Sequence, residues 1–328
     1  MKMMITGGAG FLGSMLAREL LRRGSLRGEP ITGLLLADLV ECRDEQLRSD
    51  PRVRSNAGDL LTQLPALMSE PLDAVFHLAS AVSAECEADF GLGLRSNLDT
   101  TRALLEACRT QTERSGNAPL FFFSSSVAVY GSDPALPLPE LVDDRTLPTP
   151  QSSYGIHKFM CEQLVADYTR KGYVDGRSAR LMTVSVRPGR PNGAASGFLS
   201  GIIREPLAGV EATCPVDPNT TVALASPANT IDGILTVAEA SRAEFGGRTA
   251  LNLPALTVTV NQMLAALAAE AGPAAVGRVR FERDPSIERI VGGWPARFSS
   301  ARADRLGLRA DSDFRSVIRQ FVRGRAAV

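Results

Sequence analysis

The chain has 328 residues, with 36 basic and 36 acidic side chains and 44% hydrophobic residues. This length and composition exclude a wholly disordered, collagen-like or coiled-coil chain, and they allow one large domain or two moderate ones. Because the formal net charge is zero, no bulk field favours binding to nucleic acid or to an anionic membrane.

The chain offers little for disulfide, metal or membrane chemistry. Its five cysteines stand far apart without a C-x-x-C pair, and neither of its two histidines has metal-ligand spacing. Residues 1–6 run directly into glycines, and no stretch of about 18 apolar residues follows. We therefore expect a cytoplasmic protein with no metal, no membrane span and no signal peptide.

Short apolar runs alternate with helical patterns along the first half of the chain. Apolar runs occupy residues 3–6, 31–37, 74–79, 120–123 and 183–186, and helical spacing occurs at 11–23, 96–110 and 153–169. This alternation is typical of βαβ units around a parallel sheet that is buried on both faces. The predicted fold is a doubly wound α/β sheet of the Rossmann type.

The second half is less regular. Five prolines mark residues 133–150 as a rigid loop, which we expect to form a wall of a substrate pocket. Helical patterns follow at 198–203, 231–245, 260–271 and 314–322, with short apolar runs at 250–253 and 278–281. We expect residues 1–187 to form the sheet domain and residues 188–328 to form a smaller, mostly helical region. The two are interleaved, because a segment near 222–250 is expected to return to the sheet domain.

A glycine turn follows the first predicted strand. Gly7, Gly10 and Gly13 are spaced G-x-x-G-x-x-G between a strand and a helix, which suits a tight turn, close approach of a pyrophosphate and close helix packing. The helix N-terminus adds free N–H groups for phosphate oxygens. Asp38 ends the second long run, where a carboxylate accepts the ribose hydroxyls and repels a 2′-phosphate. NAD is therefore the expected cofactor.

A serine, a tyrosine and a lysine form a second constellation. Ser126 ends the buried run of phenylalanines, and Tyr154 and Lys158 lie four residues apart on a predicted helix, so they point the same way. An ammonium beside a phenol stabilises the phenolate, which can take a proton from an alcohol while a hydride leaves the same carbon. A serine hydroxyl can hold the substrate oxygen. The three residues indicate an alcohol oxidation.

These motifs in this order resemble the extended short-chain dehydrogenase/reductases, and the resemblance covers nearly the whole chain. It rests on the glycine turn, Asp38, Asp59-Leu60, His77-Leu78-Ala79, Asn97, Ser124-Ser125-Ser126 with Val129-Tyr130-Gly131, Tyr154 to Lys158, and Arg187-Pro188. A departure is Thr100-Thr101, where the family often has Gly-Thr.

The resemblance implies a role for each matching residue. Tyr154 would be the acid/base, Lys158 would support it and bind the nicotinamide ribose, and Ser126 would be the catalytic hydroxyl. The implied cofactor-binding set is Gly7, Gly10, Phe11, Leu12, Gly13, Asp38, Asp59, Leu60, Ala79, Asn97, Tyr154, Lys158 and Pro188.

The second half bears on the substrate. Nucleotide-sugar enzymes of this family carry an Arg-Asp-aromatic element and a His for the diphosphate, and residues 224–232 contain neither. Segments 187–192, 201–207 and 293–298 are similar to a subgroup that oxidises the C2 hydroxyl of a four-carbon sugar acid with NAD. Arg297 is the candidate for the carboxylate, with Asn192, Ser125 and Ser126 for hydroxyls; each could instead be structural.

We therefore expect an NAD-dependent dehydrogenase that acts on a small sugar acid at C2, with Tyr154 as general base. The alternative is a nucleotide-sugar 4-epimerase with tightly bound NAD. A regulator that only binds NAD is disfavoured, because it would not need Ser126, Tyr154 and Lys158. The helices at 96–110 and 153–169 are apolar enough for a homodimer, as is frequent in the family.

Overall fold

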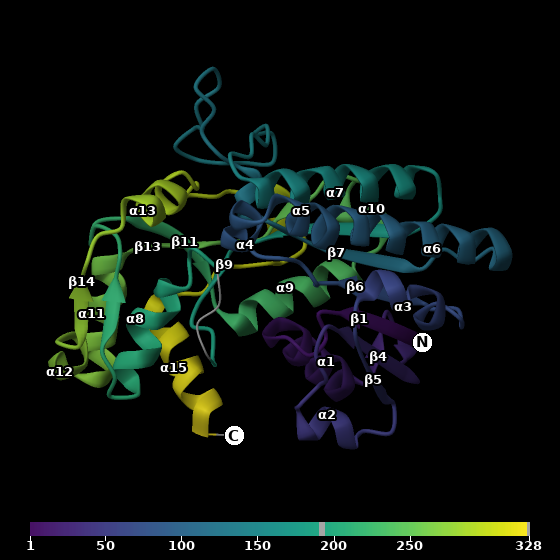
Figure 1. Cartoon of the computed structure of the whole chain (residues 1–328), viewed down its shortest axis with the longest axis horizontal. Coiled ribbons are helices and arrows are strands. Elements are labelled where there is room, and N and C mark those ends of the chain that lie inside the picture. The colour runs from purple at the N-terminus through teal and green to yellow at the C-terminus, as the bar shows by residue number, and fades with distance from the viewer. Residues whose placement is uncertain (190–193, 327–328) are drawn as a thin grey trace.

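Seven parallel strands form the central sheet, in the order β12-β8-β7-β6-β1-β4-β5 (Figure 1). The computed structural model describes residues 1–189 and 194–326. The strands of this sheet are β1 (Lys2–Thr6), β4 (Gly33–Asp38), β5 (Val53–Ala57), β6 (Ala74–His77), β7 (Leu120–Ser126), β8 (Asp175–Leu181) and β12 (Leu251–Asn252). The chain leaves β1 toward β4 on one side and returns to β6 on the other, so a topological switch point lies at the end of β1.

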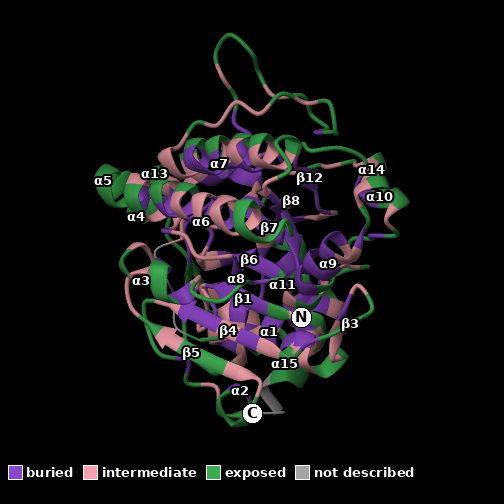
Figure 2. Ribbon diagram, turned by 90° about the vertical axis from the view of Figure 1, so that its right-hand side faces the viewer, coloured by how far each residue is buried: buried purple, intermediate pink, exposed green. Residues whose placement is uncertain are grey.

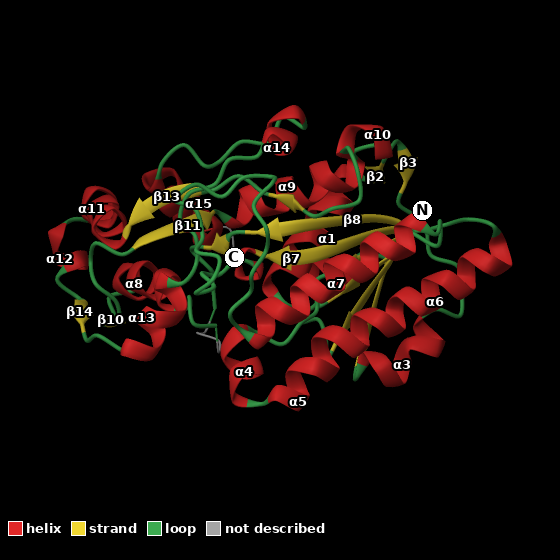
Figure 3. Cartoon of the chain, turned by 90° about the horizontal axis from the view of Figure 1, so that it is seen from above, coloured by secondary structure: helices red, strands yellow, loops and turns green. Residues whose placement is uncertain are grey.

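Helices cover both faces of this sheet (Figure 3). One layer holds α3 (Leu60–Leu67), α6 (Thr100–Ser115) and α7 (Ser153–Arg170), and the other holds α1 (Phe11–Arg23) and α9 (Pro227–Glu239). Because side chains alternate along a strand, Phe122 packs into the α1–α9 core while Phe121 and Phe123 pack into the α3–α6–α7 core. The central strands are accordingly buried, whereas the edge strand β5 is largely exposed (Figure 2).

A second region carries its own core around Ile203, Val260 and Ile318. A three-stranded sheet orders β13 (Leu256–Thr259), β11 (Thr221–Ala225) and β9 (Thr183–Val184), and β10 (Ala212–Cys214) pairs with β14 (Val279–Phe281). The helices here are α8 (Phe198–Leu207), α11 (Val260–Ala271), α12 (Pro273–Val276), α13 (Pro285–Gly292) and α15 (Phe314–Ala326). Figure 3 shows α8, α11, α12 and α13 on the left, beyond the carboxyl ends of β7 and β8.

Short elements complete the described chain. They are β2 (Ser25–Leu26), β3 (Glu29–Pro30), α2 (Glu45–Ser49), α4 (Ser83–Ala88), α5 (Phe90–Gly93), the π-helical turn η1 (Leu94–Asp99), the 3₁₀ turn η2 (Val127–Val129), α10 (Arg242–Phe245) and α14 (Ala301–Arg305). None of the helices in the described residues is both long and apolar enough to cross a bilayer.

The structure confirms the predicted fold class, with one informative difference. The run at 183–186 was expected to continue the main sheet, but β9 belongs to the small sheet, and the main strand is β8. Strand β8 lacks an apolar run because Arg177, Ser178 and Arg180 are buried along it. The chain does return to the main sheet through α9 and β12; the exact domain boundaries stay a prediction.

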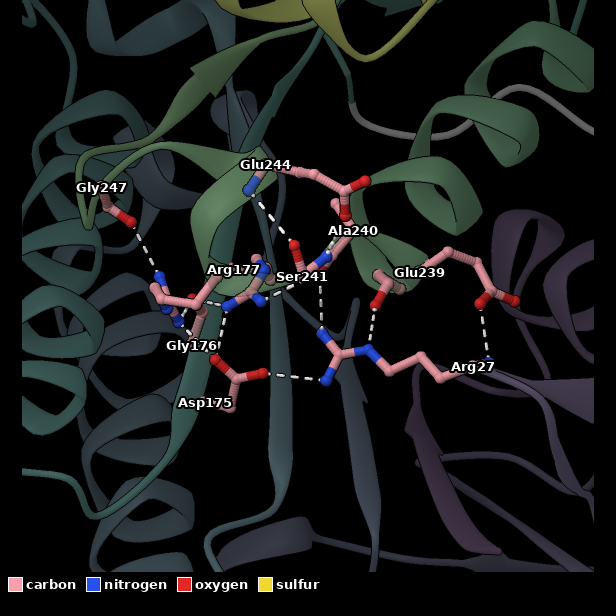
Figure 4. Close-up of polar contacts among 11 residues, drawn as sticks. Arg27, Asp175, Gly176, Arg177, Glu239, Ala240, Ser241, Glu244 and Gly247 are labelled. Carbon is pink, nitrogen blue, oxygen red and sulfur yellow. Dashed lines mark hydrogen bonds and ion pairs between the residues drawn. The ribbon is translucent and has the colours of Figure 1, made fainter.

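Asp175, at the start of β8, holds three arginines that come from separate elements (Figure 4). Its carboxylate accepts hydrogen bonds from Arg27 at 2.9 Å, from Arg177 at 2.6 Å and from Arg242 at 2.6 Å. Arg27 and Arg177 also donate to the carbonyl of Ala240. The cluster therefore ties the β2–β3 hairpin and the end of α9 to the sheet, at the opposite edge from the carboxyl ends of the strands.

We expect Asp175→Asn to destabilise the fold by about 3 kcal/mol, because it leaves the buried Arg177 guanidinium without its anion. Burial alone would raise the pKa of Asp175, but hydrogen bonds from Arg177 and Arg27 hold it at about 2, below the ordinary 3.8. A lowered folded-state pKa stabilises above the unfolded value, so this contribution is present above about pH 4 and is lost as the pH falls toward 2.

Urea unfolding of the wild type and the variant at pH 7 and at pH 3 measures this difference. Asp232→Asn is the matched control, because Asp232 forms an exposed ion pair with Arg23. Equal stability of the Asp175 and Asp232 variants at pH 7 would contradict the assignment.

Candidate active site

A cavity of about 760 Å³ lies at the carboxyl ends of the parallel strands, where the two regions meet. Its lining includes the glycine turn, the ends of β4, β6 and β7, the start of α7 and the segment that leads into α8. The loop 133–150 was expected to form a wall, and this prediction is wrong: none of its residues lines the cavity. The loop stands out at the top of Figure 1 and is tied instead to residues 297–302.

The glycine turn has the geometry of a dinucleotide cradle. Gly7 has φ +70°, which favours glycine. A Cβ at Gly13 would overlap the carbonyl of Gly7, so α1 packs directly on the turn. Gly10 caps α1 without any side-chain hydrogen bond, and the first turn of α1 lines the cavity. The free N–H groups there fit the pyrophosphate of a dinucleotide.

Gly8 is a further requirement that the motif spacing missed, because a Cβ there would lie 2.9 Å from the Cα of Leu36 on the neighbouring strand β4. Only the pairing of β1 with β4 creates this contact, so the three-residue spacing contained no signal for it.

Two acidic residues stand at the end of the cavity that is next to this turn. Asp38 accepts the N–H of Ala9 at 3.0 Å through one oxygen and lines the cavity, where a ribose would lie. Asp59 caps α3 and pairs with Arg95 at 2.9 Å, and Leu60 lines the cavity beside it. The predicted cofactor residues Asp38, Asp59 and Leu60 therefore lie together.

A buried chain of hydrogen bonds positions the loop after β6. The N–H of Ala79 donates to Thr6 Oγ1, which bonds to His77 Nδ1 at 2.6 Å, and His77 Nε2 bonds to Thr101 Oγ1 at 2.9 Å. Burial, together with the charge of Lys158, lowers the pKa of His77 to about 3, so its imidazole stays neutral. His77 is thus a buried core residue whose two ring nitrogens are both hydrogen-bonded.

Asn97 acts through the same loop and does not line the cavity. Its amide accepts the N–H of Ala81 at 2.8 Å and donates to the carbonyl of the same residue at 3.2 Å. It therefore shapes the cofactor wall through Ala81, whereas Ala79 and Pro188 line the cavity themselves.

Tyr154 and Lys158 project from the first turns of α7 into the cavity. Lys158 is buried, donates to the carbonyl of Ser124 at 2.8 Å, and lies 5.6 Å from the ring centre of Tyr154. Gly155 sets this placement, because a Cβ on it would overlap the carbonyl oxygen of Ala128 just after β7. The Tyr154 hydroxyl has no hydrogen-bond partner among the described residues and is free to meet a substrate.

The three serines that end β7 have different partners. Ser124 donates to the carbonyl of His77 at 3.0 Å, and Ser125 donates to the buried carboxylate of Glu162. Ser126 instead accepts the N–H of Ala128 at 3.1 Å, so its hydroxyl proton remains free to donate. Ser126 alone of the three can offer a proton to a substrate oxygen, while Ser125 can act only as an acceptor.

The structure does not bring Arg297, the predicted carboxylate ligand, to the cavity. Arg297 is exposed, pairs with Glu140 on the projecting loop and is absent from the cavity wall. Asn192 lies outside the described residues. Two other arginines, Arg187 and Arg204, line the cavity together with Trp294. Arg187 stood within a matched motif, but nothing local marked its side chain as a cavity residue.

Comparison with known proteins agrees with this geometry. The model of the NAD dependent epimerase/dehydratase family matches residues 3–249. The chain belongs to this family. It is 48% identical over 330 residues to D-erythronate dehydrogenase from Cupriavidus necator, covering 98% of both chains. It is 42% identical to D-erythronate dehydrogenase from Haemophilus influenzae, covering 98% of this chain and 99% of the relative.

A solved structure points to the same fold. The nucleoside-diphosphate-sugar epimerase from Agrobacterium tumefaciens superimposes with a TM-score of 0.91 at 38% identity, over 98% of this chain and 94% of the other. The prediction that this chain is an oxidoreductase of the extended short-chain family is confirmed.

Replacing Gly155 by alanine should push α7 off the end of β7 and displace both Tyr154 and Lys158. We expect loss of most catalytic activity and a lower melting temperature, which activity assays and calorimetry measure. Gly292→Ala is the matched control, because this helical glycine has open space around it. Equal activity in the two variants would contradict the close packing.

Proposed function

We propose that the protein oxidises the C2 hydroxyl of a small sugar acid of the D-erythronate type to the 2-oxo acid, with NAD as the hydride acceptor. The observation that carries the proposal is the free hydroxyls of Tyr154 and Ser126, which line one cavity together with the glycine cradle and three arginines. The names of the two relatives support the substrate class.

The residues divide the chemistry among them. Ser126 donates its free proton to the C2 oxygen and holds it in place, and Tyr154, as phenolate, takes the hydroxyl proton. The ammonium of Lys158, fixed by the Ser124 carbonyl, lies 5.6 Å from the centre of the Tyr154 ring, where its charge attracts the oxyanion that accepts the proton. Bound NAD would supply the acceptor for the hydride that leaves C2, which balances the oxidation of the alcohol to the carbonyl.

NAD fits better than NADP in this cradle. A carboxylate at the end of β4 favours ribose hydroxyls and repels a 2′-phosphate. Asp38 occupies that position, and Arg95, the nearby arginine of the cavity wall, is already paired with Asp59. We therefore propose NAD as the cofactor.

A second candidate is a nucleotide-sugar 4-epimerase that retains NAD. The name of the Agrobacterium structure favours it. Against it, the position of the family's diphosphate element is occupied by the end of β11 and by Ser226, which caps α9, so no arginine stands there.

A homodimer through α6 and α7 also stays a proposal. Ile156 and Met160 on α7 are each 43% exposed, and Phe90 on the adjacent α5 is 63% exposed. Such neighbouring apolar side chains suit an interface with a second copy.

Purified protein with excess NAD and D-erythronate should form NADH continuously, together with a 2-oxo acid that o-phenylenediamine traps as a quinoxalinone. L-threonate and UDP-galactose serve as parallel substrates. Oxidation at C3 would give a 3-oxo acid that decarboxylates to dihydroxyacetone, and this product would refute the C2 assignment. Conversion of UDP-galactose without NADH release would favour the epimerase.

Tyr154→Phe should lower turnover by at least about 100-fold, because the proton acceptor is lost. NADH binding, followed by fluorescence titration, should persist, since the glycine cradle and Asp38 are untouched. Turnover that equals the wild type would remove Tyr154 from its assigned role.

A further inference from the structure

Arg187 differs from the other cationic side chains that line the cavity. Arg95 pairs with Asp59, Arg204 pairs with Glu205, and the ammonium of Lys158 is bonded to the Ser124 carbonyl. Arg187 has no carboxylate partner among the described residues. It bonds through Nε to the Val184 carbonyl at 2.9 Å, and through one terminal nitrogen to Ser196 Oγ at a long 3.4 Å.

The backbone around Arg187 is firmly held. Its N–H donates to Ser200 Oγ at 3.0 Å, and its carbonyl accepts from Arg204 at 2.9 Å. Together with the bond from Nε to Val184, these contacts fix the stem and one edge of the guanidinium. The terminal nitrogens have only the long bond to Ser196 among the described residues, and a guanidinium in a cavity wall can donate two parallel hydrogen bonds to a carboxylate.

The charge of the surrounding wall fits an anion. The cavity residues contributed by the described part of 181–204, together with Trp294, include two arginines and no acidic side chain. The acidic lining residues, Asp38, Asp59 and Glu85, come from the cofactor half of the chain. An acidic substrate is therefore attracted to the side of the cavity that holds Arg187.

Arg187 lines the same cavity as the reacting groups Tyr154 and Ser126. Burial lowers the pKa of its guanidinium. In a 2-hydroxy acid the carbon that carries the hydroxyl is directly bonded to the carboxylate. A carboxylate held by a guanidinium beside Tyr154 thus brings C2, rather than a more distant carbon, to the phenol.

We propose that Arg187 binds the substrate carboxylate through its terminal nitrogens and thereby selects 2-hydroxy acids for oxidation at C2. This inference rests on the proposed function, which it deepens by assigning the carboxylate site to Arg187 in place of Arg297. Arg187 is a substrate-binding residue, and Arg204 is a positioning residue that holds its backbone.

The test compares Arg187→Met with Arg297→Met in the full chain. For each variant, kcat and KM are measured with D-erythronate and with its neutral amide, and NADH binding is followed by fluorescence titration. We expect Arg187→Met to lower kcat/KM for the acid roughly 100-fold, mainly through KM, because a close charge pair is lost. The amide, which has no carboxylate to lose, should be affected far less. Arg297→Met should behave as the wild type.

The outcomes separate this inference from the proposed function. If the wild type oxidises no small hydroxy acid, both fail. If the wild type oxidises D-erythronate and Arg187→Met keeps its preference for the acid over the amide, the carboxylate role is overturned while the function stands. Equal losses for acid and amide with weakened NADH binding would show a structural role and also overturn it. If Arg187→Met does not fold, Arg187→Gln is measured against the same criterion.

Discussion

The active site depends on one packing contact, in which α7 lies directly against the end of β7. Gly155 permits it, because any larger residue would collide with the Ala128 carbonyl, and Lys158 locks it by bonding to the Ser124 carbonyl. Since Tyr154 and Lys158 stand one helical turn apart, a single docked helix delivers both to the serines of β7. The rest of the sheet supports this junction by burying both faces of β7.

The sheet also contains polar networks that a simple apolar core would lack. Glu162 on α7 pairs with Arg180 on β8 at 2.7 Å and accepts the Ser125 hydroxyl, so three elements meet behind the active site. A buried carboxylate is costly unless it is paired and hydrogen-bonded, as it is here. Neutral His77 also links separate elements: beneath the cofactor wall its ring nitrogens bond to Thr6 on β1 and to Thr101 on α6. These networks hold the cavity lining in one arrangement before any ligand arrives.

Much of the cofactor half could be predicted from the sequence because its signals are local. The spacing of Gly7, Gly10 and Gly13 and the interval between Tyr154 and Lys158 each correspond to one turn or helix in the structure. The sequence patterns did not reveal strand β8, because two of its buried residues are the charged Arg177 and Arg180, whose partners Ala240 and Glu162 lie in other elements. Periodicity of apolar residues cannot report such a strand.

The substrate half could not be predicted in the same way. Arg297 looked suitable by type, yet Glu140, 157 residues away in the sequence, draws it to the surface. Arg187 stands out only once its neighbours are known, because what marks it is the absence of a carboxylate partner in the described fold. Unpaired charge in a cavity is a tertiary property, whereas a glycine turn is a local one.

The most direct test of the central claim is the fate of the hydrogen on C2. D-Erythronate that carries deuterium at C2 should give deuterated NADH, detected by mass spectrometry, and should slow the hydride step. Deuterium that remains in the oxidised carbon product, whether an acid or dihydroxyacetone, with unlabelled NADH, would show that the hydride leaves another carbon and would contradict the account.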